Sequence, residues 1–167
     1  LWLLPVLMLL WVNLHGAFVL GIGALGLCAI GTRVEWWRPR EGLRERSSET
    51  SPRHLWLVVL LTLGAASINP RGPSMLYYPF GYYLEARNPS FDIVTEFQSP
   101  NFHDWISLLF AAGLVLLMVL GVRKRRCNVV EGLLAVAFTV QALVSDRQTS
   151  AAALVLARAG LTVGLLE

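Results

Sequence analysis

The side chains that could do acid–base chemistry gather in a few places between long apolar stretches. The densest group comprises Asp92, Glu96, His103 and Asp104. Carboxylates and an imidazole can accept or donate a proton in a reaction. Tyrosine and phenylalanine rings surround them, and aromatic faces with nearby carboxylates and amides are typical of sugar binding. An interfacial helix with structural polar contacts is the alternative interpretation of this segment.

A second polar pair, Asn13 and His15, interrupts an uncharged run from Leu1 to Thr32. Polar groups at membrane depth are costly and are often functional. They can equally serve as packing contacts between helices, and the sequence leaves both interpretations open. Arg158 is the one charged residue in the apolar stretch from Gln148 to Leu166. We expect its side chain to face neighbouring helices or water.

Other familiar patterns have simpler structural interpretations. Gly21-Ile-Gly23-Ala-Leu-Gly26 fits the dinucleotide-binding pattern by its letters, but it lies inside an uncharged apolar stretch. Small residues at this spacing favour close packing of membrane helices. Basic clusters beside apolar segments set topology and contact anionic lipid headgroups, so we expect no nucleic-acid partner. Neither a metal signature nor a cofactor motif is recognisable in the sequence.

The elements that position these residues follow from a very apolar composition. Of 167 residues, 55% are hydrophobic and 15% are charged, whereas soluble domains have about 45–50% and about 25%. This composition disfavours an ordinary soluble enzyme and excludes a disordered chain. A membrane span needs about 20 apolar residues and must be helical, because hydrocarbon offers no partner for backbone groups. We predict an all-α, polytopic transmembrane bundle of about five to six helices, at residues 1–13, 16–32, 54–70, 105–122, 129–145 and 148–166.

Basic residues orient this predicted bundle in a bacterial-type inner membrane. Lys and Arg concentrate in residues 33–53 and 123–128, whereas residues 71–104 hold two arginines and four acids. The positive-inside rule makes the first two loops cytoplasmic and the third external. Within the external loop, Ser74 is predicted to cap a helix through Leu84 that lies along the membrane surface.

The predicted spans form a single transmembrane domain, residues 1–167. The first predicted helix is too short to cross a membrane alone, and residue 1 is Leu. We therefore expect the chain to be a fragment whose partners include the missing N-terminal part of the same protein.

Three short stretches together resemble a known family. They are Leu10-Trp-Val-Asn-Leu-His-Gly16, then Ile68-Asn-Pro-Arg-Gly72 leading to Tyr78-Pro79, and Glu96-Phe-Gln-Ser-Pro-Asn-Phe-His103. Their order and spacing resemble the later part of the GT-C glycosyltransferases, in particular the mannosyltransferase-like group. The similarity covers roughly residues 1–105 and, more weakly, the chain from Arg147 onward.

The resemblance implies transfer of a sugar from a polyprenyl-phosphate donor on the outer face of the membrane. The catalytic acid of such enzymes lies upstream of the region represented here, so no catalytic residue is assigned. Positions matching the family as site-lining residues are Asn13, His15, Asn69, Tyr78, Glu96, Gln98 and His103. Arg71 or His103 would face a phosphate, and Glu96 or Asp92 would bind sugar hydroxyls.

The partners implied are membrane lipid and a polyprenyl-phosphate sugar. Glycosyl transfer from a phosphate can use cations or a metal ion, but no residue pattern here supports a divalent metal.

Two other classes of function remain open from the sequence. A transporter or flippase segment would show broken helices in paired repeats, and a non-catalytic membrane scaffold would show neither repeats nor an upstream catalytic acid.

Overall fold

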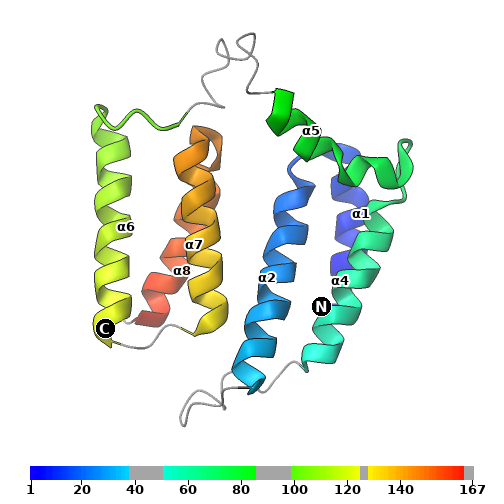
Figure 1. Cartoon of the computed structure of the whole chain (residues 1–167), viewed down its shortest axis with the longest axis horizontal. Helices are drawn as coiled ribbons and strands as arrows, with labels where there is room; N and C mark the ends of the chain where they lie inside the picture. Colours follow the sequence, from blue (N-terminus) through cyan, green and yellow to red (C-terminus); the bar gives the residue numbers. More distant parts are fainter. Residues whose placement is uncertain (38–50, 86–98, 125–127, 164–167) are drawn as a thin grey trace. The chain divides into compact units, whose positions relative to one another are not determined.

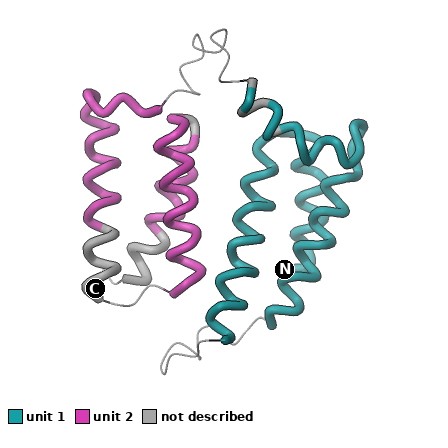
Figure 2. Tube along the Cα trace, viewed as in Figure 1, with its two compact units in different colours: residues 1–87 teal, residues 88–167 magenta. Residues whose placement is uncertain are grey.

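The computed structural model describes residues 1–37, 51–85, 99–124 and 128–163. Within these ranges every regular element is a helix, which confirms the all-α prediction (Figure 1). The chain divides into two compact units, residues 1–87 and 88–167 (Figure 2). Each unit is described by itself. Residues 38–50 and 125–127 of the two predicted cytoplasmic loops, and residues 86–98 of the predicted external loop, lie outside the described ranges.

Unit 1 contains three apolar helices, α1 (Leu4–Leu14), α2 (Phe18–Trp37) and α4 (Pro52–Ala66). A proline in the first turn of α1 and of α4 suits a position where no backbone N–H is needed. The predicted break between the first two helices is confirmed, because His15 has extended backbone angles (φ −155°, ψ 134°) and ends α1. The chain turns there and returns as α2.

Helix α4 is the centre of unit 1, since it packs against both α1 and α2. Toward one end, Met8, Val12, Phe18 and Ala66 form a buried cluster that joins all three helices. Toward the other end, Ala29 of α2 packs with Leu55 and Val59 of α4. Two small clusters placed along α4 therefore hold the three helices together.

The glycine-rich stretch lies entirely within α2, so it forms no strand-to-helix turn of the dinucleotide-binding kind. A Cβ atom at Gly21 would lie 2.7 Å from Cζ3 of Trp11 and 3.3 Å from Cε of Met8. Added Cβ atoms at Gly23 and Gly26 would meet nothing within 4 Å in the described part of the chain. Close helix packing is therefore confirmed for Gly21, where the Trp11 ring of α1 lies against α2.

The predicted helix at 54–70 is shifted in the structure, where α4 covers 52–66. Its last carbonyls accept hydrogen bonds from residues just after the helix. The Ser67 hydroxyl donates to Leu63 O (3.0 Å) and the Asn69 side-chain amide donates to Ala66 O (2.8 Å). Pro70 has no N–H to donate to Ala66 O, so a continuing helix would leave this carbonyl unpaired, and the Asn69 side chain supplies the partner instead. Helix α4 therefore ends four residues before the predicted position.

The predicted surface helix of the external loop is present in two parts. A 3-10 turn, η1 (Gly72–Leu76), precedes α5 (Tyr78–Glu85), and both lie across one end of the unit 1 helices (Figure 1). The prediction that Ser74 caps this helix is wrong. The Ser74 hydroxyl instead donates to Arg71 O at 2.6 Å, because Ser74 lies inside the 3-10 turn.

Unit 2 contains α6 (Trp105–Lys124), α7 (Val129–Val144), a 3-10 turn η4 (Asp146–Gln148) and α8 (Thr149–Val163). The side-chain oxygen of Asn128 accepts from the backbone N–H of Glu131 (2.7 Å) and caps α7. A buried cluster of Leu114, Ala142, Ala152 and Leu156 joins α6, α7 and α8. The starts of all three helices lie within one residue of their predicted positions.

Only one helix in the described ranges, α2, is both long enough and apolar enough to cross a membrane unaided. Helices α1, α4 and α7, and the part of α6 from Trp105 to Leu116, are apolar but shorter. The structure thus supports one candidate span near the N-terminus, and the bundle of five to six spans stays a prediction.

Substitution Gly21→Ala should destabilise unit 1, because the new methyl group would overlap the Trp11 ring. Overpacking of this kind costs about 1–3 kcal/mol. Gly23→Ala is the matched control, and it should stabilise α2 by up to about 1 kcal/mol because alanine favours helix. The free energy of unfolding in detergent, followed by circular dichroism, tests both. An equal effect of the two changes would contradict the packing.

Candidate functional site

Five of the predicted site residues lie at one end of unit 1, where α1 ends, α2 begins and α4 ends. We call this the polar end, and it comprises Asn13, His15, Asn69, Arg71 and Tyr78. They are separated by up to 65 positions along the chain, yet hydrogen bonds and ring contacts connect their segments. The structure therefore brings together residues that the sequence placed in two separate stretches.

Asn13 connects the last turn of α1 to the segment after α4. Its side-chain amide donates to Leu9 O (2.8 Å) and to Ile68 O (3.2 Å). The first bond lies within α1, whereas the second joins residues 55 positions apart. Asn13 is exposed, so these bonds fix the position of the segment that leads into Asn69 without burying the amide.

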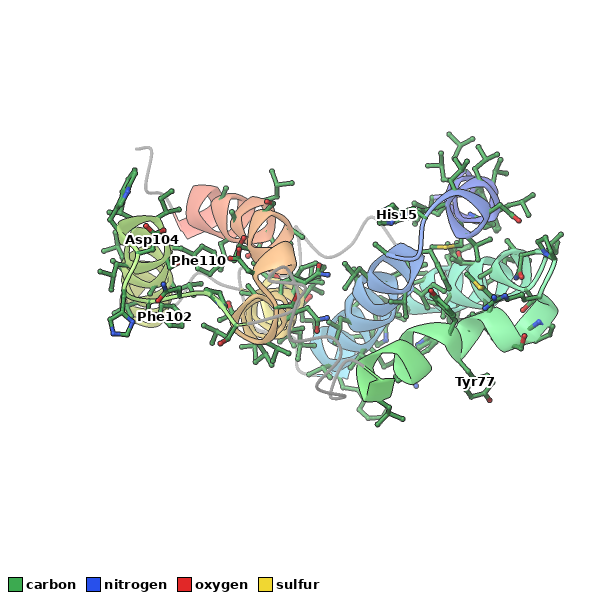
Figure 3. All side chains as sticks on the ribbon, turned by 90° about the horizontal axis from the view of Figure 1, so that it is seen from above. His15, Tyr77, Phe102, Asp104 and Phe110 are labelled. Atoms are coloured by element: carbon green, nitrogen blue, oxygen red, sulfur yellow. The ribbon has the colours of Figure 1, made fainter. Side chains whose placement is uncertain are left out.

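His15 lies on the link between α1 and α2 (Figure 3). Its Nδ1 accepts a hydrogen bond from the backbone N–H of Ala17 (3.0 Å), just before the first residue of α2. A ring nitrogen that accepts carries no proton, so the neutral imidazole carries its proton on Nε2. The exposed ring therefore satisfies the start of α2 through one of its two nitrogens.

Asn69 organises the turn between α4 and η1. Its amide donates to Ala66 O (2.8 Å) and Gly72 O (3.0 Å), and its Oδ1 accepts from the backbone N–H of Arg71 (2.8 Å). Gly72 has φ +60°, a left-handed conformation that glycine adopts at little cost. One half-buried side chain thus uses both donors and its acceptor to hold the backbone around Arg71.

Arg71 and Tyr78 present a cation beside an aromatic ring. The guanidinium carbon of Arg71 lies 5.5 Å from the centroid of the Tyr78 ring, within the range of a cation–π interaction. A Cβ atom at Gly16 would lie 3.9 Å from Cε1 of Tyr78, which places this ring beside the α1–α2 link. Both side chains are exposed. A fixed, exposed guanidinium suits an anion such as a phosphate.

The other predicted site residues lie outside the described part of unit 1. Glu96 and Gln98 lie outside the described ranges, and His103 belongs to unit 2. There, Asn101 Oδ1 accepts from the His103 backbone N–H (3.1 Å) and lies 3.2 Å from its ring Nδ1, just before α6. Phe102 and Asp104 flank His103 in this turn (Figure 3).

Sequence reasoning missed Gly16 and Gly72, which shape the polar end without supplying polar side chains. Gly72 allows the left-handed turn, and Gly16 lies beside the Tyr78 ring at a distance that an added Cβ atom would fill with ordinary van der Waals contact. The Asn-Pro-Arg-Gly order of residues 69–72 was the available signal, since such residues are typical of tight turns. In the ranges described, no three His, Cys, Asp or Glu residues lie close enough to hold a metal ion.

Comparisons with known proteins give no match of any kind: no family model, no curated protein and no solved structure is similar to this chain.

Replacing Asn69 by Ala should loosen the polar end, because Arg71 N–H, Ala66 O and Gly72 O all lose a partner. Leaving half-buried polar groups unpaired costs about 1–3 kcal/mol. The same change at Asn101, whose turn is exposed, should cost no more than about 0.5 kcal/mol. Hydrogen exchange of residues 66–78 and 99–105 measures both local effects. Unchanged protection of residues 66–78 in the Asn69→Ala variant would contradict the role of Asn69.

Proposed function

We propose that this chain belongs to a multi-pass membrane protein whose polar end forms one wall of a site for a lipid-linked sugar donor. The proposed reaction is transfer of the sugar from a polyprenyl-phosphate donor to an acceptor at the outer membrane surface. The observation that carries this proposal is the meeting of Asn13, His15, Asn69, Arg71 and Tyr78 at one end of apolar helices.

The outward faces of the helices support a membrane location. In α4, Leu57, Leu60 and Leu61 are 44%, 64% and 44% exposed, although they carry no polar group. In α7, Val136, Val140 and Val144 recur every fourth residue and are also exposed. Helices of soluble proteins place charged residues on such faces, and large exposed apolar patches mark contact with lipid or with another protein.

Helix lengths are compatible with several crossings. At 1.5 Å per residue, the 20 residues of α2 extend about 30 Å, which matches the hydrocarbon thickness. The 15 residues of α4 and the 11 of α1 extend about 22 Å and about 16 Å. Short helices are accommodated when flanking residues enter the membrane or the bilayer thins locally.

The polar end has the chemistry that the proposed reaction requires of a donor site. During transfer, the acceptor oxygen bonds to the anomeric carbon of the sugar while the bond from that carbon to the phosphate oxygen breaks. Negative charge then develops on the leaving phosphate, and the Arg71 guanidinium can stabilise it through two parallel hydrogen bonds. The Tyr78 ring and the His15 imidazole would line the same position. The catalytic acid or base comes from residues outside the polar end.

A non-catalytic membrane scaffold is the second candidate function. Asn13, His15 and Asn69 all bond to backbone groups at helix ends, as purely structural residues would. The exposed Arg71–Tyr78 pair distinguishes the two functions, since a scaffold does not require an exposed cation there.

Arg71→Ala in the complete protein should lower sugar transfer by at least about tenfold, because a lost charge-assisted hydrogen bond costs about 1.5–3 kcal/mol. Transfer of a radiolabelled sugar from polyprenyl phosphate in isolated membranes measures the effect. Arg147→Ala removes the same charge from η4 and is the control, with transfer expected to stay near wild type. Normal transfer by Arg71→Ala at normal expression would remove Arg71 from the site.

Cysteine labelling tests the orientation of unit 1 in cells. In a background with Cys28 and Cys127 replaced by Ser, Ser74→Cys should react with an impermeant maleimide in intact cells. Arg53→Cys, at the opposite end of α4, should react only after permeabilisation. Both positions are exposed, so burial does not limit either reaction. The reverse pattern would place the polar end in the cytoplasm and contradict the proposal.

A further inference from the structure

The opposite end of unit 1 gathers exposed tryptophans and arginines. It is where α2 ends and where α1 and α4 begin. We call it the basic–aromatic end, and it comprises Trp2, Arg33, Trp36, Trp37, Arg53, His54 and Trp56. The packing of Ala29 against Leu55 and Val59 brings the end of α2 beside the start of α4. An edge-to-face contact between the Trp2 and His54 rings, with centroids 6.4 Å apart, brings the segment before α1 to the same place.

The Arg33 side chain extends toward the terminus of α2. Its guanidinium carbon lies 4.7 Å from the centroid of the Trp37 ring, four residues further along the helix. The charge is therefore held against the ring of the last residue of α2. An arginine that extends in this way keeps its stem along an apolar surface and its charge at the membrane–water boundary.

The tryptophans of this end are largely uncovered. Trp2, Trp36 and Trp37 are 60%, 62% and 70% exposed, and Trp56 is 41% exposed. Indole rings in such positions lie at the level of lipid headgroups, with the apolar ring toward the chains and the N–H toward polar groups. Arg33 and Arg53 are also exposed, and the one acid among the described residues of this end is the half-buried Glu35.

We propose that the basic–aromatic end is a binding surface for the headgroups of anionic phospholipids. The proposal rests on the membrane location proposed above, and it concerns the end of unit 1 that lies away from the polar end. Arg33, supported by the Trp37 ring, donates hydrogen bonds to lipid phosphate oxygens, and Arg53 adds a second positive charge. The exposed indoles of Trp2, Trp36 and Trp56 hold this end at headgroup depth. Bound lipid thus fixes which end of unit 1 faces the anionic leaflet.

Lipid competition on the full chain tests the proposal. The chain is purified in detergent with a mixture of phosphatidylglycerol and phosphatidylcholine, and native mass spectrometry gives the ratio of the two bound lipids. The wild-type chain should prefer phosphatidylglycerol. Arg33→Gln should reduce that preference about fivefold, the equivalent of about 1 kcal/mol for one charge at an anionic surface. Trp37→Ala should act in the same direction, because Arg33 loses the ring that orients it.

Arg147→Gln is the matched control, since it removes one positive charge outside unit 1 and should leave the lipid preference unchanged. Circular dichroism verifies that each variant keeps its helix content. Equal effects of Arg33→Gln and Arg147→Gln, or an unchanged preference in Arg33→Gln, would overturn the inference. Flotation with vesicles of both lipids separates this result from the proposed function. A chain that floats with neither vesicle contradicts the membrane location itself.

Discussion

Hydrogen bonding at the ends of apolar helices is the constraint on which unit 1 depends. A helix leaves unpaired carbonyls at one end and unpaired N–H groups at the other, and an apolar environment offers them no water. In unit 1 the side chains of His15 and Asn69 supply such partners, and Asn13 holds the segment after α4 through Ile68 O. The turns that these bonds define bring α1, α2 and α4 together at one place, and the polar end is the consequence.

This arrangement connects structural and functional roles in the same residues. Asn69 ends α4 and simultaneously fixes the backbone of Arg71, so a residue that stabilises the fold also orients the exposed cation. His15 uses one ring nitrogen at the start of α2, while its ring stays exposed at the polar end. The two ends of unit 1 also differ in the side chains that they expose. One presents amides, an imidazole and a single arginine, and the other presents arginines among tryptophans.

Much of the architecture was predictable because it follows from local patterns. The break near His15, the apolar helices of both units and the surface helix after Arg71 all appear where apolar runs, glycines and prolines predict them. The end of α4 was misplaced because hydropathy does not register side chains that bond back to the helix, as Ser67 and Asn69 do. The role of Ser74 was misassigned for a related reason, since a 3-10 turn and an α-helix begin with the same residue types.

The amino-acid order alone established that this chain is helical and apolar, and it singled out Asn13 and His15 as polar residues within an apolar run. The family resemblance added Asn69, Arg71 and Tyr78 as candidate site residues. Their proximity came from the folding of the chain, because α1 and α4 are joined by long-range packing and by the Asn13–Ile68 bond. The same holds for Gly21, whose contact with Trp11 distinguishes it from Gly23 and Gly26. Periodicity describes one helix at a time, whereas these distances depend on which faces of two helices meet.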